Sequence, residues 1–181
     1  MATPSVERRS DVVARLLREA LSLTDASLVI HRGGVLVEFK TDLLPGELSV
    51  WAEGRHRSWQ IGEFEGHHCH FNLESINEVH FDAEPVPCQG GRINYTIWFL
   101  CERDCGNPHR PHGLFSVTLN HPYETDGTPR RRIIGQVAAL FDRERQCPIV
   151  TASRVFTDAI GVLSQEFHPT TGESVQNVSG D

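Results

Sequence analysis

Apolar residues near the start of the chain recur at the spacing of an amphipathic helix. They fall at i, i+3 and i+4 after Pro4 and Ser5, and they are Val12, Val13, Leu16, Leu17, Ala20 and Leu21. The pattern predicts a helix over about residues 5–22. A second helix is expected over about residues 130–143, and a weaker one over about residues 152–165.

Between these helices the hydrophobic pattern changes to that of strands. Residues 27–31 and 35–40 flank Gly33-Gly34, which is a hairpin signal. Further strand-like runs occupy residues 48–51, 58–61, 69–73, 78–81, 93–100 and 114–119. In residues 93–99 apolar side chains alternate with polar ones, as in a sheet with one buried face. A long series of strands without interleaved helices predicts an α+β domain. We expect an antiparallel sheet of about eight strands, with the N-terminal and C-terminal helices packed on it.

Length and charge narrow the class of protein. The chain has 181 residues, enough for one domain, expected over residues 1–167, and the polar tail at 168–181 is expected to be disordered. A net charge of −7 disfavours a strongly basic nucleic-acid binder. No apolar run reaches the roughly 18–20 residues that cross a bilayer, and charges among the first twenty residues argue against a signal peptide. A cytoplasmic protein with five reduced cysteines is therefore expected.

One loop carries residue types that could bind a metal. Cys101, Cys105, His109 and His112 place two thiols and two imidazoles within twelve residues. Sulfur and nitrogen ligands of this kind form tetrahedral Zn²⁺ sites, although the spacing is not that of a standard zinc finger. The alternative is a polar hairpin extension with free thiols. No nucleophile elbow, P-loop or dinucleotide fingerprint is present, so the case for an enzyme is weak.

Several segments together resemble a known family. Residues 27–40 read S-L-V-I-H-R-G-G-V-L-V-E-F-K and are followed by Leu44-Pro45-Gly46-Glu47. Residues 70–85 align without a gap on a second family block, and Gly91-Arg92, residues 114–119 and residues 136–141 match more weakly. Over roughly residues 8–143 the chain resembles the cytosolic heme-utilisation carriers of the ChuX/HutX type, and it is similar to one half of the larger HemS-type hemin proteins.

The resemblance implies a curved sheet covered by helices, a homodimer, and heme as the ligand. Heme would be held for trafficking, storage or utilisation, with a donor or acceptor protein as a possible partner. The family's two iron-side histidines fall on His31 and His70. Heme also needs an apolar slot and cations for its propionates. Arginines bind carboxylates bidentately, which makes Arg32 and Arg92 candidate propionate partners, together with Arg55 and Arg57. Four aromatic residues could form its walls, namely Trp51, Trp59, Tyr95 and Phe99.

The chain also departs from the family pattern. Residues 85–92 lack the family's Phe-Met pair and contain inserted residues, and the turn before Leu114 is lengthened by residues 101–112. An alternative function is therefore a non-enzymatic zinc-binding interaction protein, which would keep the fold, use the loop at 101–112 and have lost heme binding. Heme degradation is the one enzymatic function left open.

Overall fold

The structure is a computed structural model that describes residues 8–32, 35–41, 49–53, 56–62, 68–87, 90–105, 107 and 110–167. Within these ranges, the side chains at positions 31, 49–53, 56–59, 61, 62, 68 and 163–167 lie outside the description. The expected tail at residues 168–181 lies outside the described residues as well. None of the described helices is long and apolar enough to cross a bilayer.

All three expected helices are confirmed. They are α1 (Arg9–Leu21), α2 (Arg131–Glu144) and α3 (Arg154–Phe167). Asp11 lies in the first turn of α1, where its carboxylate accepts a hydrogen bond from Arg8 and complements the positive end of the helix dipole. The hydroxyl of Ser153 accepts a hydrogen bond from the Phe156 amide at 3.1 Å and satisfies an otherwise unpaired amide at the start of α3.

The strands form two sheets, where the sequence predicted one of about eight strands. The larger sheet has six strands in the order β2-β1-β8-β7-β6-β9, and the smaller has the order β3-β4-β5. The strands of the larger sheet are β1 (Ala26–Arg32), β2 (Val35–Lys40), β6 (Ile76–Val86), β7 (Arg92–Cys101), β8 (Gly113–Leu119) and β9 (Val150–Ala152). Those of the smaller sheet are β3 (Ser49–Glu53), β4 (His56–Gly62) and β5 (His68–Phe71).

The α+β class is confirmed, and the sequence pattern missed one strand. β9 is only three residues long, too short for alternation to show, and it pairs parallel to β6, so the larger sheet is not wholly antiparallel. The short 3-10 helix η2 (Leu73–Ser75) separates β5 from β6. The side chain of Asn72 accepts a hydrogen bond from the Glu74 amide at 3.1 Å and fixes this turn, where the chain leaves the smaller sheet for the larger one.

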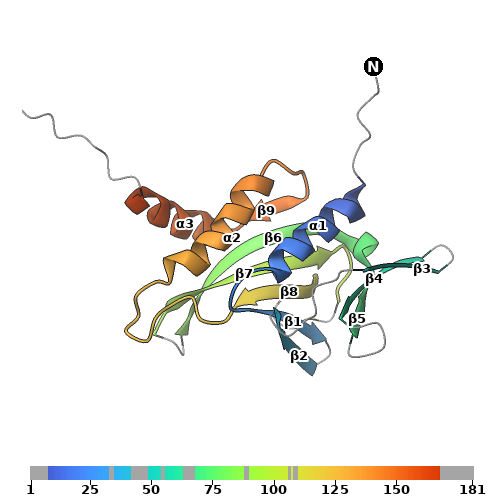
Figure 1. Ribbon diagram of the computed structural model, residues 1–181, viewed down its shortest axis with the longest axis horizontal. Coiled ribbons are helices and arrows are strands. Elements are labelled where there is room, and N and C mark those ends of the chain that lie inside the picture. Colours follow the sequence, from blue (N-terminus) through green and yellow to red (C-terminus); the bar gives the residue numbers. More distant parts are fainter. Residues whose placement is uncertain are drawn as a thin grey trace, which may run out of the picture.

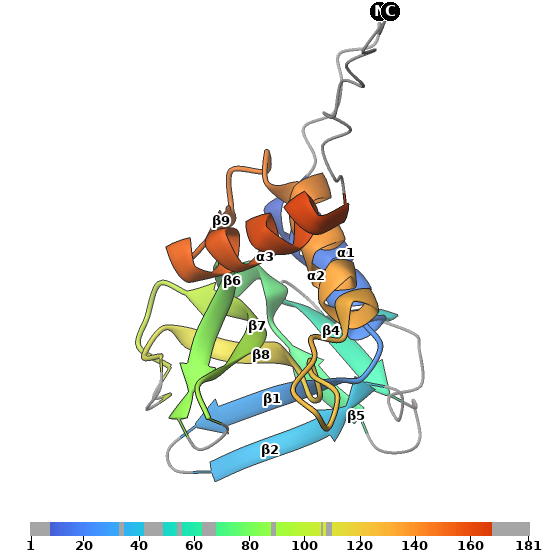
Figure 2. The same ribbon diagram turned by 90° about the vertical axis from the view of Figure 1, so that its left-hand side faces the viewer.

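The helices cover one face of the curved six-stranded sheet, and the core lies between the two layers (Figure 1; Figure 2). Phe81 of β6 packs against Phe141 of α2 and Phe156 of α3, with ring centroids 5.3 and 5.6 Å apart. Phe99 of β7 stacks on Phe115 of β8 at 4.7 Å, and both rings are buried. Burial of such side chains is the main driving force for this packing.

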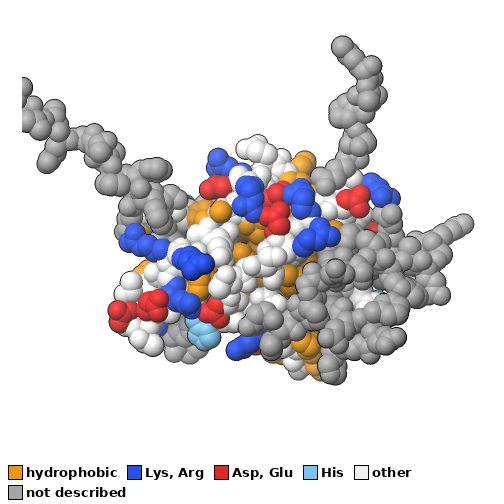
Figure 3. Space-filling view, viewed as in Figure 1, with side chains coloured by type: hydrophobic (Ala, Val, Ile, Leu, Met, Phe, Trp, Pro, Cys, Tyr) orange, Lys and Arg blue, Asp and Glu red, His pale blue; other side chains and the backbone are white. Residues whose placement is uncertain are grey.

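Ion pairs join α1 to α2 at the rim of the core. Arg15 pairs with Glu144, and Arg143 pairs with Glu19, so each helix contributes one cation and one anion. Basic and acidic side chains are accordingly mixed over the helical layer in the space-filling view (Figure 3). The pair of Arg143 with Glu19 is largely exposed and adds little stability, whereas Glu144 in the other pair is buried.

Candidate functional site

A groove of about 450 Å³ lies where β1 and β7 end and where η2 meets the start of α1. Its volume is within the range of small-molecule pockets, roughly 300–1,000 Å³. The residues that line it are Arg9, Arg32, Glu74, Ser75, Asn77, Cys101, Glu102, Arg103, Asp104, Cys105 and Leu114. Among the described residues, this set brings together three that the sequence had selected: Arg32, Cys101 and Cys105.

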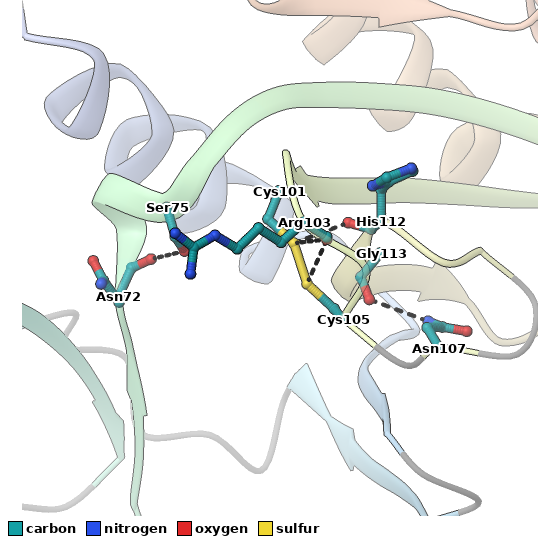
Figure 4. The surroundings of a disulfide bond; sticks show 8 residues. All are labelled: Asn72, Ser75, Cys101, Arg103, Cys105, Asn107, His112 and Gly113. Carbon is teal, nitrogen blue, oxygen red and sulfur yellow. Dashed lines mark hydrogen bonds between the residues drawn. A yellow bond between two sulfur atoms is a disulfide. The ribbon is translucent and has the colours of Figure 1, made fainter.

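Three guanidinium groups border the groove. Arg32 is the last residue of β1, Arg9 is the first of α1, and Arg103 belongs to the connection between β7 and β8. Arg9 donates a hydrogen bond to the Glu74 carbonyl oxygen at 3.1 Å, which joins α1 to η2. Arg103 extends from the connection toward Ser75 on the opposite wall (Figure 4). Guanidinium groups can bind a carboxylate or a phosphate, and in this groove they lie among three carboxylate side chains, those of Glu74, Glu102 and Asp104.

Cys101 and Cys105 are joined by a disulfide at this groove. The expectation that all five cysteines are reduced is therefore wrong for these two, whereas Cys69 and Cys147 are free. The prediction took no account of how close the two cysteines lie to one another in the sequence. Burial raises the pKa of the free Cys69 thiol above its usual value of 9.0, which keeps this thiol protonated at neutral pH.

The zinc interpretation of the same loop finds no support. Two sulfurs bonded to each other cannot act as two thiolate ligands. The side chain of His112 is exposed, while its carbonyl oxygen accepts a hydrogen bond from the Cys101 amide at 2.9 Å. His109 lies outside the described residues. Over the part of the chain that the structure describes, no group of three or more His, Cys, Asp or Glu residues could hold a metal ion.

The two histidines selected from the sequence lie on different sheets. His31 is in β1 and pairs with Leu36 of β2, and its side chain is outside the description. His70 is in β5 of the smaller sheet, pairs with Gln60 of β4, and is exposed. The groove is lined by residues that follow these histidines in the chain: Arg32 comes directly after His31, and Glu74, Ser75 and Asn77 come four to seven residues after His70. Neither histidine is among the described residues that line it.

The two candidate arginines do not share a site. β1 and β7 both pair antiparallel with β8, so they run parallel to each other. Arg32 ends β1 and Arg92 begins β7, which places the two residues at opposite ends of the sheet. The Arg92 guanidinium lies 5.8 Å from the centroid of the Tyr123 ring in a cation–π contact. Arg55 lies outside the described residues, and so does the side chain of Arg57.

Two of the four aromatic residues considered as walls for a ligand belong to the hydrophobic core instead. Tyr95 and Phe99 are buried in the core, where Tyr95 meets Phe156 at 6.4 Å and Phe99 stacks on Phe115. Burial raises the pKa of the Tyr95 hydroxyl, with a further contribution from Tyr123, so it stays protonated. The side chains of Trp51 and Trp59 are outside the description. The described apolar contribution to the groove comes from Leu114 and the disulfide.

A polar cluster lies on the sheet face that the helices leave uncovered. Asp82 of β6 accepts a hydrogen bond from Arg110 at 2.8 Å, and the Arg110 guanidinium lies 5.6 Å from the centroid of the Trp98 ring. Burial of Asp82 raises its pKa, but a hydrogen bond with Ser153 and the charges of Arg110 and His80 outweigh this and hold it below 3.8. The connection between β7 and β8 is thus anchored across the sheet, and it carries Arg103 and the disulfide.

The described residues define the class of fold: a curved six-stranded sheet with helices on one face, beside a second small sheet. The solved structures that share it include two of ChuX. One, described as the crystal structure of ChuX, has a TM-score of 0.52 at 10% identity and covers 77% of this chain and 76% of its own. The other, described as the heme binding protein ChuX, has a TM-score of 0.52 at 11% identity and covers 76% of each chain.

These likenesses confirm the expected ChuX-type fold, and at such identities they show the fold alone. No family model and no curated protein matches the sequence. Sequence reasoning missed Arg9 and Arg103 as members of the groove. Arg9 is on a helix whose neighbours in space no local pattern reveals. Arg103 stands between the two selected cysteines, so its position in the sequence was a usable signal.

Proposed function

We propose that this chain binds heme at the groove beside Arg32, for trafficking, storage or utilisation in the cell. The observation that carries the proposal is a groove of about 450 Å³ that is lined by three arginines and by residues that follow His31 and His70 in the chain. The fold shared with ChuX, one structure of which is described as a heme binding protein, supports the same ligand. The volume suits a small-molecule ligand, and the guanidinium groups suit the two propionates.

The roles follow from the chemistry of heme. Its iron takes an axial ligand from a neutral imidazole nitrogen, and it supplies the redox and ligand-binding chemistry when bound. We assign that ligand to His70 or His31, or to one from each subunit of a dimer. Arg32, Arg9 and Arg103 would pair with the propionates, and Leu114 with the disulfide would contact the apolar part of the macrocycle. Heme bound in this way would be cargo for trafficking, storage or utilisation.

A hemin titration followed by absorbance tests the proposal. We expect a sharpened, red-shifted Soret band on addition of hemin to the protein. His31→Ala and His70→Ala, singly and together, should remove or change that band if an imidazole ligates the iron.

His121→Ala is the matched control, because His121 pairs with Asp25 just before β1, at the far end of that strand from Arg32. A spectrum unchanged in the double variant would contradict the ligand assignment, and absence of any spectral change on addition of hemin would contradict the function.

We further propose that two copies associate through β2, which would form the homodimer that the resemblance implies. β2 is the outer strand of the larger sheet, so one side of its backbone has no neighbouring strand in that sheet. Val35, Leu36 and Val37 are exposed by 61%, 56% and 37%. Apolar side chains are visible at the lower edge of the molecule, where β2 lies (Figure 3; Figure 1). Leu36→Lys should shift the sedimentation coefficient to that of a monomer, whereas Val162→Lys on α3, which is 60% exposed, should not.

A further inference from the structure

The disulfide encloses an arginine that lines the groove. Cys101 ends β7, Cys105 follows four residues later, and Arg103 lies midway between them. The ring that the bond closes therefore fixes the backbone from which the Arg103 side chain reaches into the groove (Figure 4). The bond therefore constrains where the charge of Arg103 lies in the groove.

The surroundings of the sulfurs suit the reduced state as well. Cys101 Sγ lies 2.9 Å from the Arg103 carbonyl oxygen and 3.5 Å from the His112 carbonyl oxygen. Cys105 Sγ lies 3.4 Å from the Arg103 carbonyl oxygen. A disulfide has no proton to donate to these oxygens, whereas two thiols would find acceptors already in place. Cys101 is buried and Cys105 is half-buried, which leaves Cys105 as the sulfur that a reductant can reach.

We propose that Cys101 and Cys105 form a reversible redox site that sets the affinity of the groove for a dicarboxylate ligand. The ligand class rests on the proposed function, and the redox site itself does not. A dithiol reductant attacks Cys105 Sγ as a thiolate and forms a mixed disulfide, while the S–S electron pair leaves with Cys101, which takes up a proton. The second thiol of the reductant then displaces Cys105, which is protonated in turn. The protein gains two electrons and two protons, and the reductant becomes a disulfide.

Reduction is expected to weaken ligand binding. In the disulfide state the position of Arg103 is ordered before the ligand arrives, whereas in the dithiol state part of that ordering is lost and must be repeated on binding. Ordering one long side chain and its backbone changes the affinity by roughly two- to tenfold. The disulfide state should therefore bind the dicarboxylate more tightly by about this factor.

The test uses iron-free protoporphyrin IX, which keeps both propionates but has no metal that a thiol could reduce or ligate. Binding is followed by porphyrin fluorescence with the disulfide protein and with protein reduced by dithiothreitol and desalted without oxygen. Cys101→Ser with Cys105→Ser should bind like the reduced protein in both conditions, and Cys147→Ser should keep the difference. Arg103→Ala should bind weakly and equally in both states, while Arg145→Ala, near Asp142 on the outer surface of α2, should behave like the unaltered protein.

Hydrogen exchange separates a failure of this inference from a failure of the proposed function. The Cys105 amide donates to the Pro111 carbonyl oxygen at 2.6 Å, and its exchange should be faster in the reduced protein. If neither hemin nor protoporphyrin IX binds in either state, heme binding is wrong, and faster exchange on reduction still supports the redox site. Equal exchange at residues 102–105 in the two states, or equal porphyrin affinities where binding occurs, would overturn the inference.

Discussion

Arg110 donates a hydrogen bond to the Asp82 carboxylate at 2.8 Å and so ties the connection between β7 and β8 to the middle of β6. The pair lies on the sheet face opposite the helical layer, with Asp82 only 8% exposed at its side chain. The same connection holds the disulfide and Arg103. The contact therefore links the framework of the sheet to the wall of the groove, although neither residue lines the groove itself.

Replacing Asp82 should destabilise the fold. Asp82→Asn removes the charge that pairs with Arg110 and weakens the acceptor of its hydrogen bond. Hydrogen bonds to charged groups contribute about 1.5–3 kcal/mol, and we expect a loss of about 1–3 kcal/mol in the free energy of unfolding. Urea denaturation measures it. Asp142→Asn is the control, because its side chain is 58% exposed and its ion pair with Arg145 is long, at 3.9 Å. A change no larger for Asp82→Asn than for Asp142→Asn would contradict the role given to this pair.

Stability should fall on acidification below about pH 6.5, in part through His80. Burial, together with the nearby charge of Arg110, lowers the pKa of His80 below 6.5, although Asp82 and Glu78 act in the opposite direction. The unfolded chain then binds the proton at a higher pH than the folded protein does. The contribution of neutral His80 is complete above pH 6.5 and is lost as the pH falls through the folded pKa. Asp82 adds a loss of the same sign below about pH 3.8, because its pKa is lowered too.

Denaturation curves at several pH values between about pH 7 and about pH 5 test this dependence. His80→Asn keeps a polar partner for Thr151, whose hydroxyl lies 2.7 Å from His80 Nδ1, but it cannot titrate. We expect the variant to lose less stability than the original protein over this pH range. Parallel curves for the two proteins would show that His80 does not contribute.

The stack of Phe99 on Phe115 is expected to dominate the stability of the larger sheet. Phe99 is fully buried, and its ring centroid lies 4.7 Å from that of Phe115. Truncation to alanine leaves a cavity in addition to the lost burial, and Phe99→Ala should cost about 3–5 kcal/mol in the free energy of unfolding. Val162→Ala, at a side chain that is 60% exposed, should change it by less than about 0.5 kcal/mol. Similar midpoints for the two variants in urea would contradict the assignment of Phe99 to the core.

Local patterns predicted the three described helices and every described strand except β9, because those elements carry a recognisable hydrophobic pattern. Apolar side chains at every second position from Ile93 to Phe99 marked a buried face, and the burial of Tyr95, Ile97 and Phe99 confirms it. What local patterns could not predict was which strands share a sheet, because pairing depends on partners far apart in the chain. β9 shows this most clearly: its three residues have no periodicity, and they pair with residues of β6 that lie 71 positions earlier in the chain, as in Val79 with Val150.

The groove was predicted only in part, for the same physical reason. Arg32 and the two cysteines stood out through local sequence, yet their meeting with Arg9 and Glu74 depends on how α1 and η2 pack. Arg92 looked equivalent to Arg32 in the sequence, as one arginine beside a strand end resembles another. The parallel course of β1 and β7 separates them, and only the topology of the sheet contains that information.

This separation gives a direct comparison between two arginines in heme binding. Arg32→Ala removes a guanidinium group from the groove, and Arg92→Ala removes one that contacts Tyr123 at the other end of the sheet. Because Arg32 is exposed, its pairing with a propionate is partly screened by water, and we expect only a two- to fivefold weaker affinity, or roughly 0.4–1 kcal/mol. Arg92→Ala should leave the affinity unchanged. Hemin titrations of both variants at low and at high salt measure the difference, which should shrink as salt rises. A larger loss for Arg92→Ala than for Arg32→Ala would move the heme site to the other end of the sheet.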